Sequence, residues 1–234
     1  ADLTAQTVQC DIQDVDAGLE AYSSPAFYMI PPIDALMQNT IRINRSSTAD
    51  GIGYTTLAHE GYPGHLYQSA YFNDREPVPV RRLLACGGYN EGWGLYSELY
   101  AYSFDNGLPE AVKPLMRCSE ASSYGLYALL DICIHYDGWD LATTTSYLEN
   151  SYGLRIRNPR GENTWTIIDN PGNYLKYYNR YLEILTMRQG SRGGTWKQIQ
   201  RQELPPSSIL NMDGASFPGH QTVFSNMADD GEIA

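Results

Sequence analysis

A proline-glycine pair interrupts the helical pattern of this chain between two histidines that are six residues apart. The segment reads Leu57-Ala58-His59-Glu60-Gly61-Tyr62-Pro63-Gly64-His65. Residues four apart in an α-helix lie about 40° apart around its axis, whereas residues six apart are about 120° out of register. His59 and His65 therefore reach a common point only if the helix bends between them. Pro63 and Gly64 are residues at which such a kink is expected.

Helix start and stop signals divide the rest of the chain into a mainly helical pattern. They predict helices from Thr55 or Thr56 into Pro63, from Asn90 to Asn106, from Pro109 to Gly138, from Asp140 to Gly153, and from Pro171 to about Gly190. Two short runs, 26–30 and 39–44, have the apolar and alternating patterns of strands. We therefore expect a mainly α fold with a small antiparallel sheet near the N-terminus, and a single domain over residues 1–234.

Charge and composition exclude several classes of partner. The formal net charge is −11 and the sequence pI is about 4.7, so the chain repels nucleic-acid phosphates and anionic membrane surfaces. It has no apolar run of about 18 residues, and we expect no membrane-spanning segment. The four cysteines lack a Cys-x-x-Cys spacing, which leaves disulfide bridges and free buried thiols both open.

The segment around the proline-glycine pair carries residue types that bind zinc in hydrolases. Two histidines on one helical face bind the metal in such enzymes, and a glutamate beside the first histidine activates a water molecule. His59, Glu60 and His65 supply these types, and they include two of the four histidines of the chain. Spacing alone leaves two interpretations open, a metal site and ordinary polar side chains.

A second segment supplies carboxylates on a separate predicted helix. Glu91 follows His65 by 26 positions, and Glu98 lies two turns further along the same face. Both could be solvated surface charges, but Trp93, Tyr96 and their apolar neighbours leave little of this helix exposed. Since a buried carboxylate needs a partner, we favour Glu91 as a third metal ligand and Glu98 as a residue that orients a ligating histidine.

Five sequence blocks together resemble one protein family. They are Ser24–Tyr28, Leu57–His65, Asn90–Glu98, Ile134–Trp139 and Asn170–Tyr178. In this combination they look like the bacterial zincin-like proteins catalogued as domain of unknown function 885, over most of the chain. The resemblance implies a zincin-like, gluzincin-type helical metallopeptidase fold in which His59, His65 and Glu91 bind Zn²⁺.

A more distant resemblance implies roles for tyrosines of the last predicted helix. Tyr174-Leu175-Lys176-Tyr177 is similar to the Tyr-x-x-Tyr pair of angiotensin-converting enzyme, in which one hydroxyl stabilises the oxyanion and the other holds the substrate. Tyr177 would then be catalytic, and Tyr174 and Tyr178 would bind substrate. The alternative is core packing of these rings at helical spacing with Tyr181, and the sequence does not decide which ring faces the metal.

A third histidine lies on the long predicted helix. Tyr124, Tyr127, Asp131 and His135 share one face of it, so Asp131 is placed one turn before His135 and could orient its imidazole. A satisfied core histidine is the alternative. The family block favours a catalytic, substrate-contacting role for His135.

These residues predict a zinc-dependent hydrolase that cleaves peptide bonds, with Glu60 as general base. Two alternatives stay open: a binding module that keeps the scaffold without catalysis, and a zinc hydrolase of non-peptide amides or esters. Proteins of the family are usually longer, and this chain resembles their C-terminal part. The resemblance therefore implies an N-terminal half that completes the active-site channel, and a location in the bacterial cell envelope or outside the cell.

Overall fold

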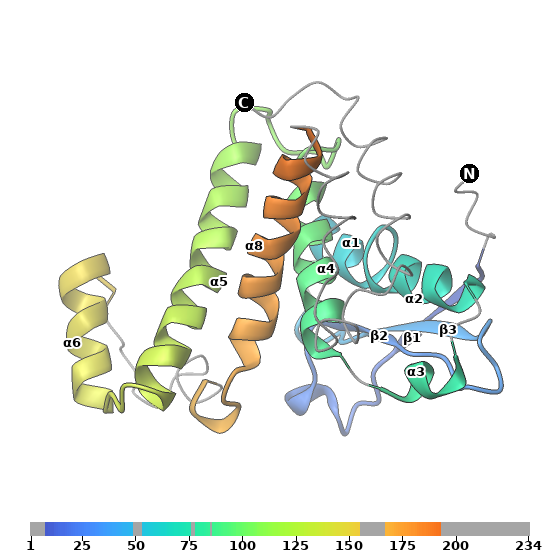
Figure 1. Ribbon diagram of the computed structural model, residues 1–234, viewed down its shortest axis with the longest axis horizontal. Coiled ribbons are helices and arrows are strands. Elements are labelled where there is room, and N and C mark those ends of the chain that lie inside the picture. Colours follow the sequence, from blue (N-terminus) through green and yellow to red (C-terminus); the bar gives the residue numbers. More distant parts are fainter. Residues whose placement is uncertain (1–7, 49–52, 76–77, 85, 155–166, 193–234) are drawn as a thin grey trace.

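The computed structural model describes residues 8–48, 53–75, 78–84, 86–154 and 167–192. Figure 1 shows a small sheet on one side of the molecule, with α1 (Tyr54–Glu60) and α2 (His65–Asp74) above it and α3 (Pro79–Leu83) below. The helices α4 (Gly87–Ala101), α5 (Lys113–His135) and α8 (Asn173–Arg192) stand beside the sheet, and α6 (Leu141–Tyr152) lies beyond α5. The fold is mainly helical, as the sequence predicts.

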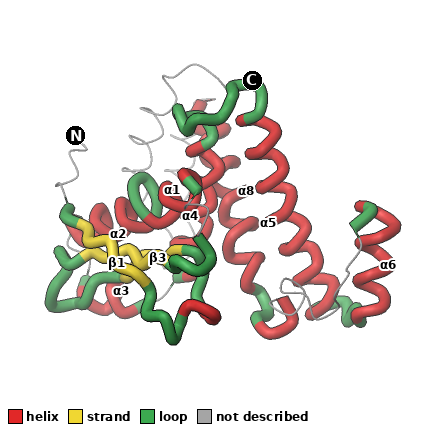
Figure 2. The backbone as a smooth tube through the Cα atoms, turned by 180° about the vertical axis from the view of Figure 1, so that it is seen from behind, coloured by secondary structure: helices red, strands yellow, loops and turns green. Residues whose placement is uncertain are grey.

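The sheet is mixed, so the prediction of an antiparallel sheet is wrong in part. Its order is β1 (Cys10–Asp14), β3 (Asn39–Ile43), β2 (Ala26–Met29), and Figure 2 shows it from behind. The predicted strands β2 and β3 pair antiparallel, but β1 joins the other edge of β3 in parallel. The sequence did not indicate β1 because four of its five residues are exposed, which leaves no alternating apolar pattern. In β3 alternate residues are buried, as its pattern predicts.

Helix α4 is the centre of the hydrophobic core. Its residues from Gly92 to Ala101 are all buried, and it packs against α8, α1, α2 and α5. The principal cluster joins Trp93, Leu95, Tyr96, Leu99 and Tyr100 of α4 to Tyr181 and Ile184 of α8. This agrees with the expectation that little of this helix is exposed.

Several helix ends differ from the sequence prediction. The first predicted helix, which was expected to run into Pro63, ends at Glu60, and α2, which was not predicted, begins at His65 after the turn. The helix α3 was not predicted, since five residues are too few to show periodicity. The limits of α6 are confirmed: the Asp140 side chain accepts a hydrogen bond from the Thr143 N–H at 2.8 Å, and Gly153 ends the helix in the left-handed conformation.

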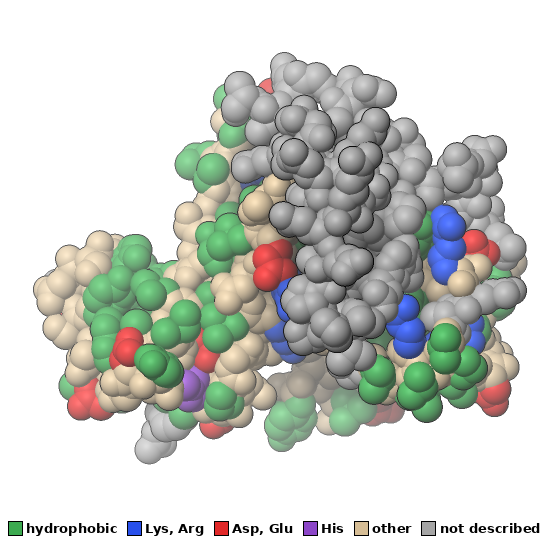
Figure 3. All heavy atoms as spheres, in the orientation of Figure 1, with side chains coloured by type: hydrophobic (Ala, Val, Ile, Leu, Met, Phe, Trp, Pro, Cys, Tyr) green, Lys and Arg blue, Asp and Glu red, His purple; other side chains and the backbone are tan. Residues whose placement is uncertain are grey.

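Apolar side chains on the outer helices remain partly exposed. Leu115, Leu129, Ile132 and Leu141 are each between 38% and 68% exposed, and Figure 3 shows hydrophobic side chains over α5 and α6. The opposite side of α5 is buried at Leu130. No helix in the described ranges combines the length and apolar content needed to cross a bilayer.

Asp131 fixes the start of α8. Its carboxylate is 1% exposed and accepts hydrogen bonds from the N–H groups of Gly172 at 2.9 Å and Tyr174 at 3.3 Å. Gly172 has a φ of 77°, a conformation that favours glycine, so the helix begins after it and not at Pro171. Asp131 therefore positions the helix that carries the predicted site tyrosines.

We expect Asp131→Ala to lower the free energy of unfolding by about 2–3 kcal/mol, because two backbone donors at the start of α8 lose their charged acceptor. Urea unfolding followed by circular dichroism measures this. Asp140→Ala is the matched control, since it removes a similar but exposed cap from α6 and should cost less. Equal effects of the two substitutions would show that Asp131 has no special part in placing α8.

Candidate metal centre

The turn between α1 and α2 brings the two histidines together. A Cβ atom on Gly64 would lie 1.8 Å from the His59 carbonyl oxygen, so only glycine allows the chain to fold back this closely. The Trp93 indole N–H donates to the Pro63 carbonyl at 2.9 Å and ties the turn to α4. The imidazole rings of His59 and His65 consequently lie edge to face, with centroids 4.7 Å apart.

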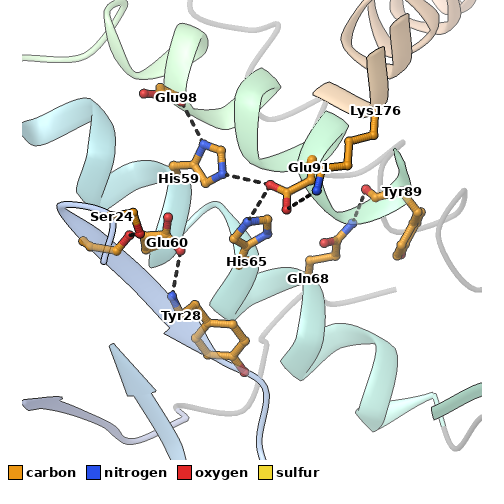
Figure 4. A network of polar contacts seen from close by, with 11 residues as sticks. Ser24, Tyr28, His59, Glu60, His65, Gln68, Tyr89, Glu91, Glu98 and Lys176 are labelled. Atoms are coloured by element: carbon orange, nitrogen blue, oxygen red, sulfur yellow. Dashed lines mark hydrogen bonds and ion pairs between the residues drawn. The ribbon is translucent and has the colours of Figure 1, made fainter. Parts of the chain in front are cut away.

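One face of α4 receives the His59 ring. Glu91, Gly94 and Glu98 follow one another along this face, and a Cβ atom on Gly94 would lie 2.4 Å from His59 Nε2. The ring therefore rests on the helix backbone at the glycine. Its Nδ1 lies 2.8 Å from Glu98 Oε2, whereas its Nε2 faces Glu91 (Figure 4). The predicted role of Glu98, to hold the imidazole of a ligating histidine, agrees with this contact.

Three ligand atoms converge at the centre of this arrangement. Glu91 Oε2 lies 3.6 Å from His59 Nε2 and 3.6 Å from His65 Nε2, and the three atoms all lie within 4.8 Å of one another. A contact of 3.6 Å is long for a hydrogen bond. It is close to the edge of a tetrahedron around zinc, about 3.3–3.6 Å for bonds of about 2.0–2.2 Å. The donor types and the two 3.6 Å separations thus match a candidate zinc site, while the three atoms together span up to 4.8 Å.

Charges in the cluster are strongly coupled. Burial lowers the pKa of His59, but its polar contacts with Glu91 and Glu98 outweigh burial and raise the pKa to about 10. Burial raises the pKa of Glu91, but the close approach of both imidazoles reverses this and holds the pKa well below its usual range. The carboxylates of Glu91 and Glu98 therefore favour a positive charge at His59.

Glu60 faces the sheet instead of the histidine pair. Its Oε2 accepts a hydrogen bond at 2.8 Å from the backbone N–H of Tyr28, which is on the edge strand β2 (Figure 4). Burial raises the pKa of Glu60 above its ordinary value, and the nearby charges of His59 and His65 only partly offset the rise. Glu60 is thus a buried carboxylate with a raised pKa beside the candidate metal cluster.

Of the three predicted tyrosines, Tyr177 lies at the cluster. Its ring centroid is 6.3 Å from that of His59. Burial, the Glu91 charge and a hydrogen bond with Glu91 raise the pKa of Tyr177, so its hydroxyl stays protonated and can donate. Tyr174 packs on Tyr127 at 4.9 Å between centroids, and Tyr178 packs on Gly125 and Tyr181. These contacts agree with the core-packing alternative for Tyr174 and Tyr178.

His135 is the last residue of α5 and lies away from the contacts of the histidine pair. Its Nε2 lies 2.9 Å from the Ile167 carbonyl oxygen and 3.8 Å from Asp131 Oδ1. Asp131 is thus near the imidazole, as its spacing predicts, but its hydrogen bonds go to the start of α8. The described contacts satisfy one nitrogen of His135 at an exposed position, so they match neither the core alternative nor a contact with the histidine pair.

Three residues that the sequence analysis did not select also belong to this region. Burial and the neighbouring Glu98 carboxylate raise the pKa of Glu120. Glu120 lies one turn before Tyr124 and so extends the predicted face of α5. Lys176 Nζ lies 3.9 Å from Glu91 Oε1, and Gly94 provides the surface under His59. Their signals were weak: a carboxylate four residues before Tyr124, a lysine beside Tyr177, and a glycine between two glutamates on one face.

The fold and the cluster define a mainly helical protein with a candidate His-His-Glu metal centre. The chain belongs to the family described as bacterial protein of unknown function (DUF885), whose model matches residues 2–197. A solved structure with a similar fold is described as the putative lipoprotein from Colwellia psychrerythraea, with 21% sequence identity and a TM-score of 0.63. The match covers 97% of this chain but 39% of that one. No curated protein sequence matches significantly.

We expect Gly94→Ala to weaken zinc binding by about 10- to 100-fold, because the added methyl group displaces the imidazole of His59 from α4. Competition with a chromophoric chelator measures the affinity, and circular dichroism verifies the helical content. Gly53→Ala is the control, since a Cβ atom there meets its neighbours no closer than 3.4 Å. Unchanged affinity in Gly94→Ala would contradict the described position of the ring.

Zinc binding should release a proton from His59. With a pKa of about 10 against about 6.5 when unfolded, the protonated ring stabilises the metal-free fold fully below pH 6.5, and this stabilisation is lost as the pH rises through 10. The metal needs the neutral ring, so zinc affinity should rise over the same window.

Calorimetry at pH 7.5 in two buffers of different ionisation enthalpy measures this release. His135→Gln should release the same number of protons as the unmodified chain, because His135 is outside the cluster. A zinc affinity that is independent of pH between 6.5 and 9 would refute the protonated state of His59.

Proposed function

We propose that this chain is a zinc-dependent hydrolase that cleaves peptide bonds through an activated water molecule. One observation carries the proposal: two imidazole nitrogens and a carboxylate oxygen converge within 4.8 Å, beside a separate buried carboxylate whose pKa is raised. His59, His65 and Glu91 would hold the zinc ion. When bound, zinc would polarise a water molecule and the carbonyl group of the substrate.

Residues of this chain would then move the protons. Glu60 accepts a proton from the water molecule and passes it to the leaving amine. The hydrogen bond from the Tyr28 N–H keeps the Glu60 carboxylate oriented. Tyr177 stays protonated and donates a hydrogen bond to the oxygen that becomes negative in the transition state, an effect typically worth about 3 kcal/mol. Glu98 holds His59 through Nδ1 and so presents Nε2 to the ion.

The activity would be located at the bacterial cell envelope or outside the cell. The description of the solved neighbour as a putative lipoprotein supports this location. Its chain is much longer than this one. We therefore include in the proposal a further helical segment, on the N-terminal side in the whole protein, that forms the other wall of the active-site channel.

Glu60→Gln tests the mechanism. Glutamine keeps an oxygen that can accept the Tyr28 N–H but cannot take a proton from water, so turnover should fall by about 10²- to 10⁴-fold while zinc affinity changes little. Cleavage of a mixed peptide library by the zinc-loaded chain, read by mass spectrometry with and without a chelator, measures turnover. Glu149→Gln, on an exposed position of α6, is the control.

The same assay separates the other candidate functions. Full activity in Glu60→Gln would show that the general-base assignment is wrong. Zinc bound at one equivalent without any cleavage would favour a binding module on the same scaffold, and cleavage of esters or non-peptide amides alone would change the substrate class.

A further inference from the structure

The two oxygens of Glu91 face different partners. Oε2 is directed toward both imidazoles at 3.6 Å, whereas Oε1 faces the ammonium group of Lys176 at 3.9 Å. Figure 4 shows Lys176 reaching this carboxylate from α8, on the side away from His59 and His65. A metal ion held through Oε2 would thus have a fixed positive charge on the far side of the same carboxylate.

Packing places Lys176 beside the cluster, where its ammonium group makes long contacts with Glu91 and Tyr177. A Cβ atom on Gly87 would lie 3.2 Å from Lys176 Cδ, so the aliphatic stem lies on the backbone at the start of α4. The Nζ atom is 5.4 Å from the centroid of the Tyr177 ring, and the side chain is 37% exposed. Because 3.9 Å exceeds hydrogen-bond distance, the N–H donors of Lys176 are not satisfied by Glu91.

A cation at this point changes which substrates the centre can accept. Glu60, Glu91 and Glu98 surround the histidine pair with carboxylates, and they would repel an anionic substrate. Lys176 offsets that repulsion on the side where the cluster is partly exposed. A lysine ammonium group is a compact charge with three donors, suited to bind a carboxylate from a partly solvated position.

We propose that Lys176 binds a substrate carboxylate, so that the centre selects peptides whose free C-terminal carboxylate lies one residue beyond the cleaved bond. This inference rests on the proposed peptide hydrolysis. The C-terminal carboxylate is the anionic group that every such peptide carries next to its last amide bond. Because Lys176 lies beside the carboxylate that would hold the metal, an anion bound by Lys176 would lie near the cleaved bond.

Binding of succinate to the zinc-loaded chain tests the proposal without any turnover. Succinate can place one carboxylate at the metal and the other at Lys176, whereas succinamide has the same length and no charge. Calorimetry should show that Lys176→Met weakens succinate binding by about tenfold or more and leaves succinamide unaffected, and that Lys176→Arg largely restores succinate binding. Arg45→Met, which removes a charge from an exposed pair with Asp14, should bind succinate as the unmodified chain does.

Zinc affinity and peptide cleavage complete the test. Lys176→Met should bind zinc at least as tightly as the unmodified chain, because a neighbouring positive charge is gone. Its KM should rise for peptides with a free C-terminus and not for their C-terminal amides. Weakened zinc binding would show that Lys176 supports Glu91 instead, and unchanged succinate affinity would equally overturn the inference. A rise in KM that is confined to peptides with acidic side chains would also overturn it.

The outcomes also separate this inference from the proposed function. If peptides are cleaved but Lys176→Met binds succinate as tightly as the unmodified chain, the proposed function stands and the role of Lys176 is overturned. Succinate binding that depends on Lys176, without any cleavage, supports the anion site and overturns the hydrolase.

Discussion

The imidazole of His59 lies directly on the backbone of α4 at Gly94, and the candidate centre depends on this contact. The close approach fixes the plane of the ring between two glutamates of the same helix face, with Nδ1 toward Glu98 and Nε2 toward Glu91. A side chain at position 94 would separate the ring from both. The helix α4 therefore supplies the candidate ligand Glu91, the residue Glu98 that orients the candidate ligand His59, and the surface at Gly94 on which the His59 ring rests.

Electrostatics favours a positive charge at the centre of the cluster, where a proton and a metal ion would compete. Glu91 is held ionised by two imidazoles, and His59 is held protonated by two carboxylates, although both side chains are largely buried. Neither group would keep its charge alone in this position, because desolvation opposes it. A divalent cation would satisfy the same carboxylate and both imidazole nitrogens at once. The coupling that stabilises the metal-free cluster is thus the coupling that would give it affinity for zinc.

The sequence pattern predicted well which residues share a helix face, because helix faces follow from local periodicity. Glu91 and Glu98 share a face as their spacing requires, and His65 reaches His59 as the Pro63-Gly64 pair suggests. What it could not predict depends on close approach between distant segments. The distance from Lys176 to Glu91 and the contact of Gly94 with His59 arise where α4 meets α8 and α1, and no local pattern encodes them. The parallel pairing of β1 was not predicted for the same reason. It depends on contact with β3, and the exposed residues of β1 carry no strand pattern of their own.

The small sheet has a positional role that follows from helix geometry. Consecutive residues of a helix differ by about 100° in direction, so His59 and Glu60, at the end of α1, cannot both face α4. His59 faces it, and Glu60 turns to the edge strand, where the N–H of Tyr28 holds it. In the proposed hydrolase, a general base held by the sheet and a metal ligand held by a helix would then act on one substrate from two sides. The turn at Gly64 brings His65 back to the side of His59, so the sheet, the turn and α4 each hold one part of the same centre.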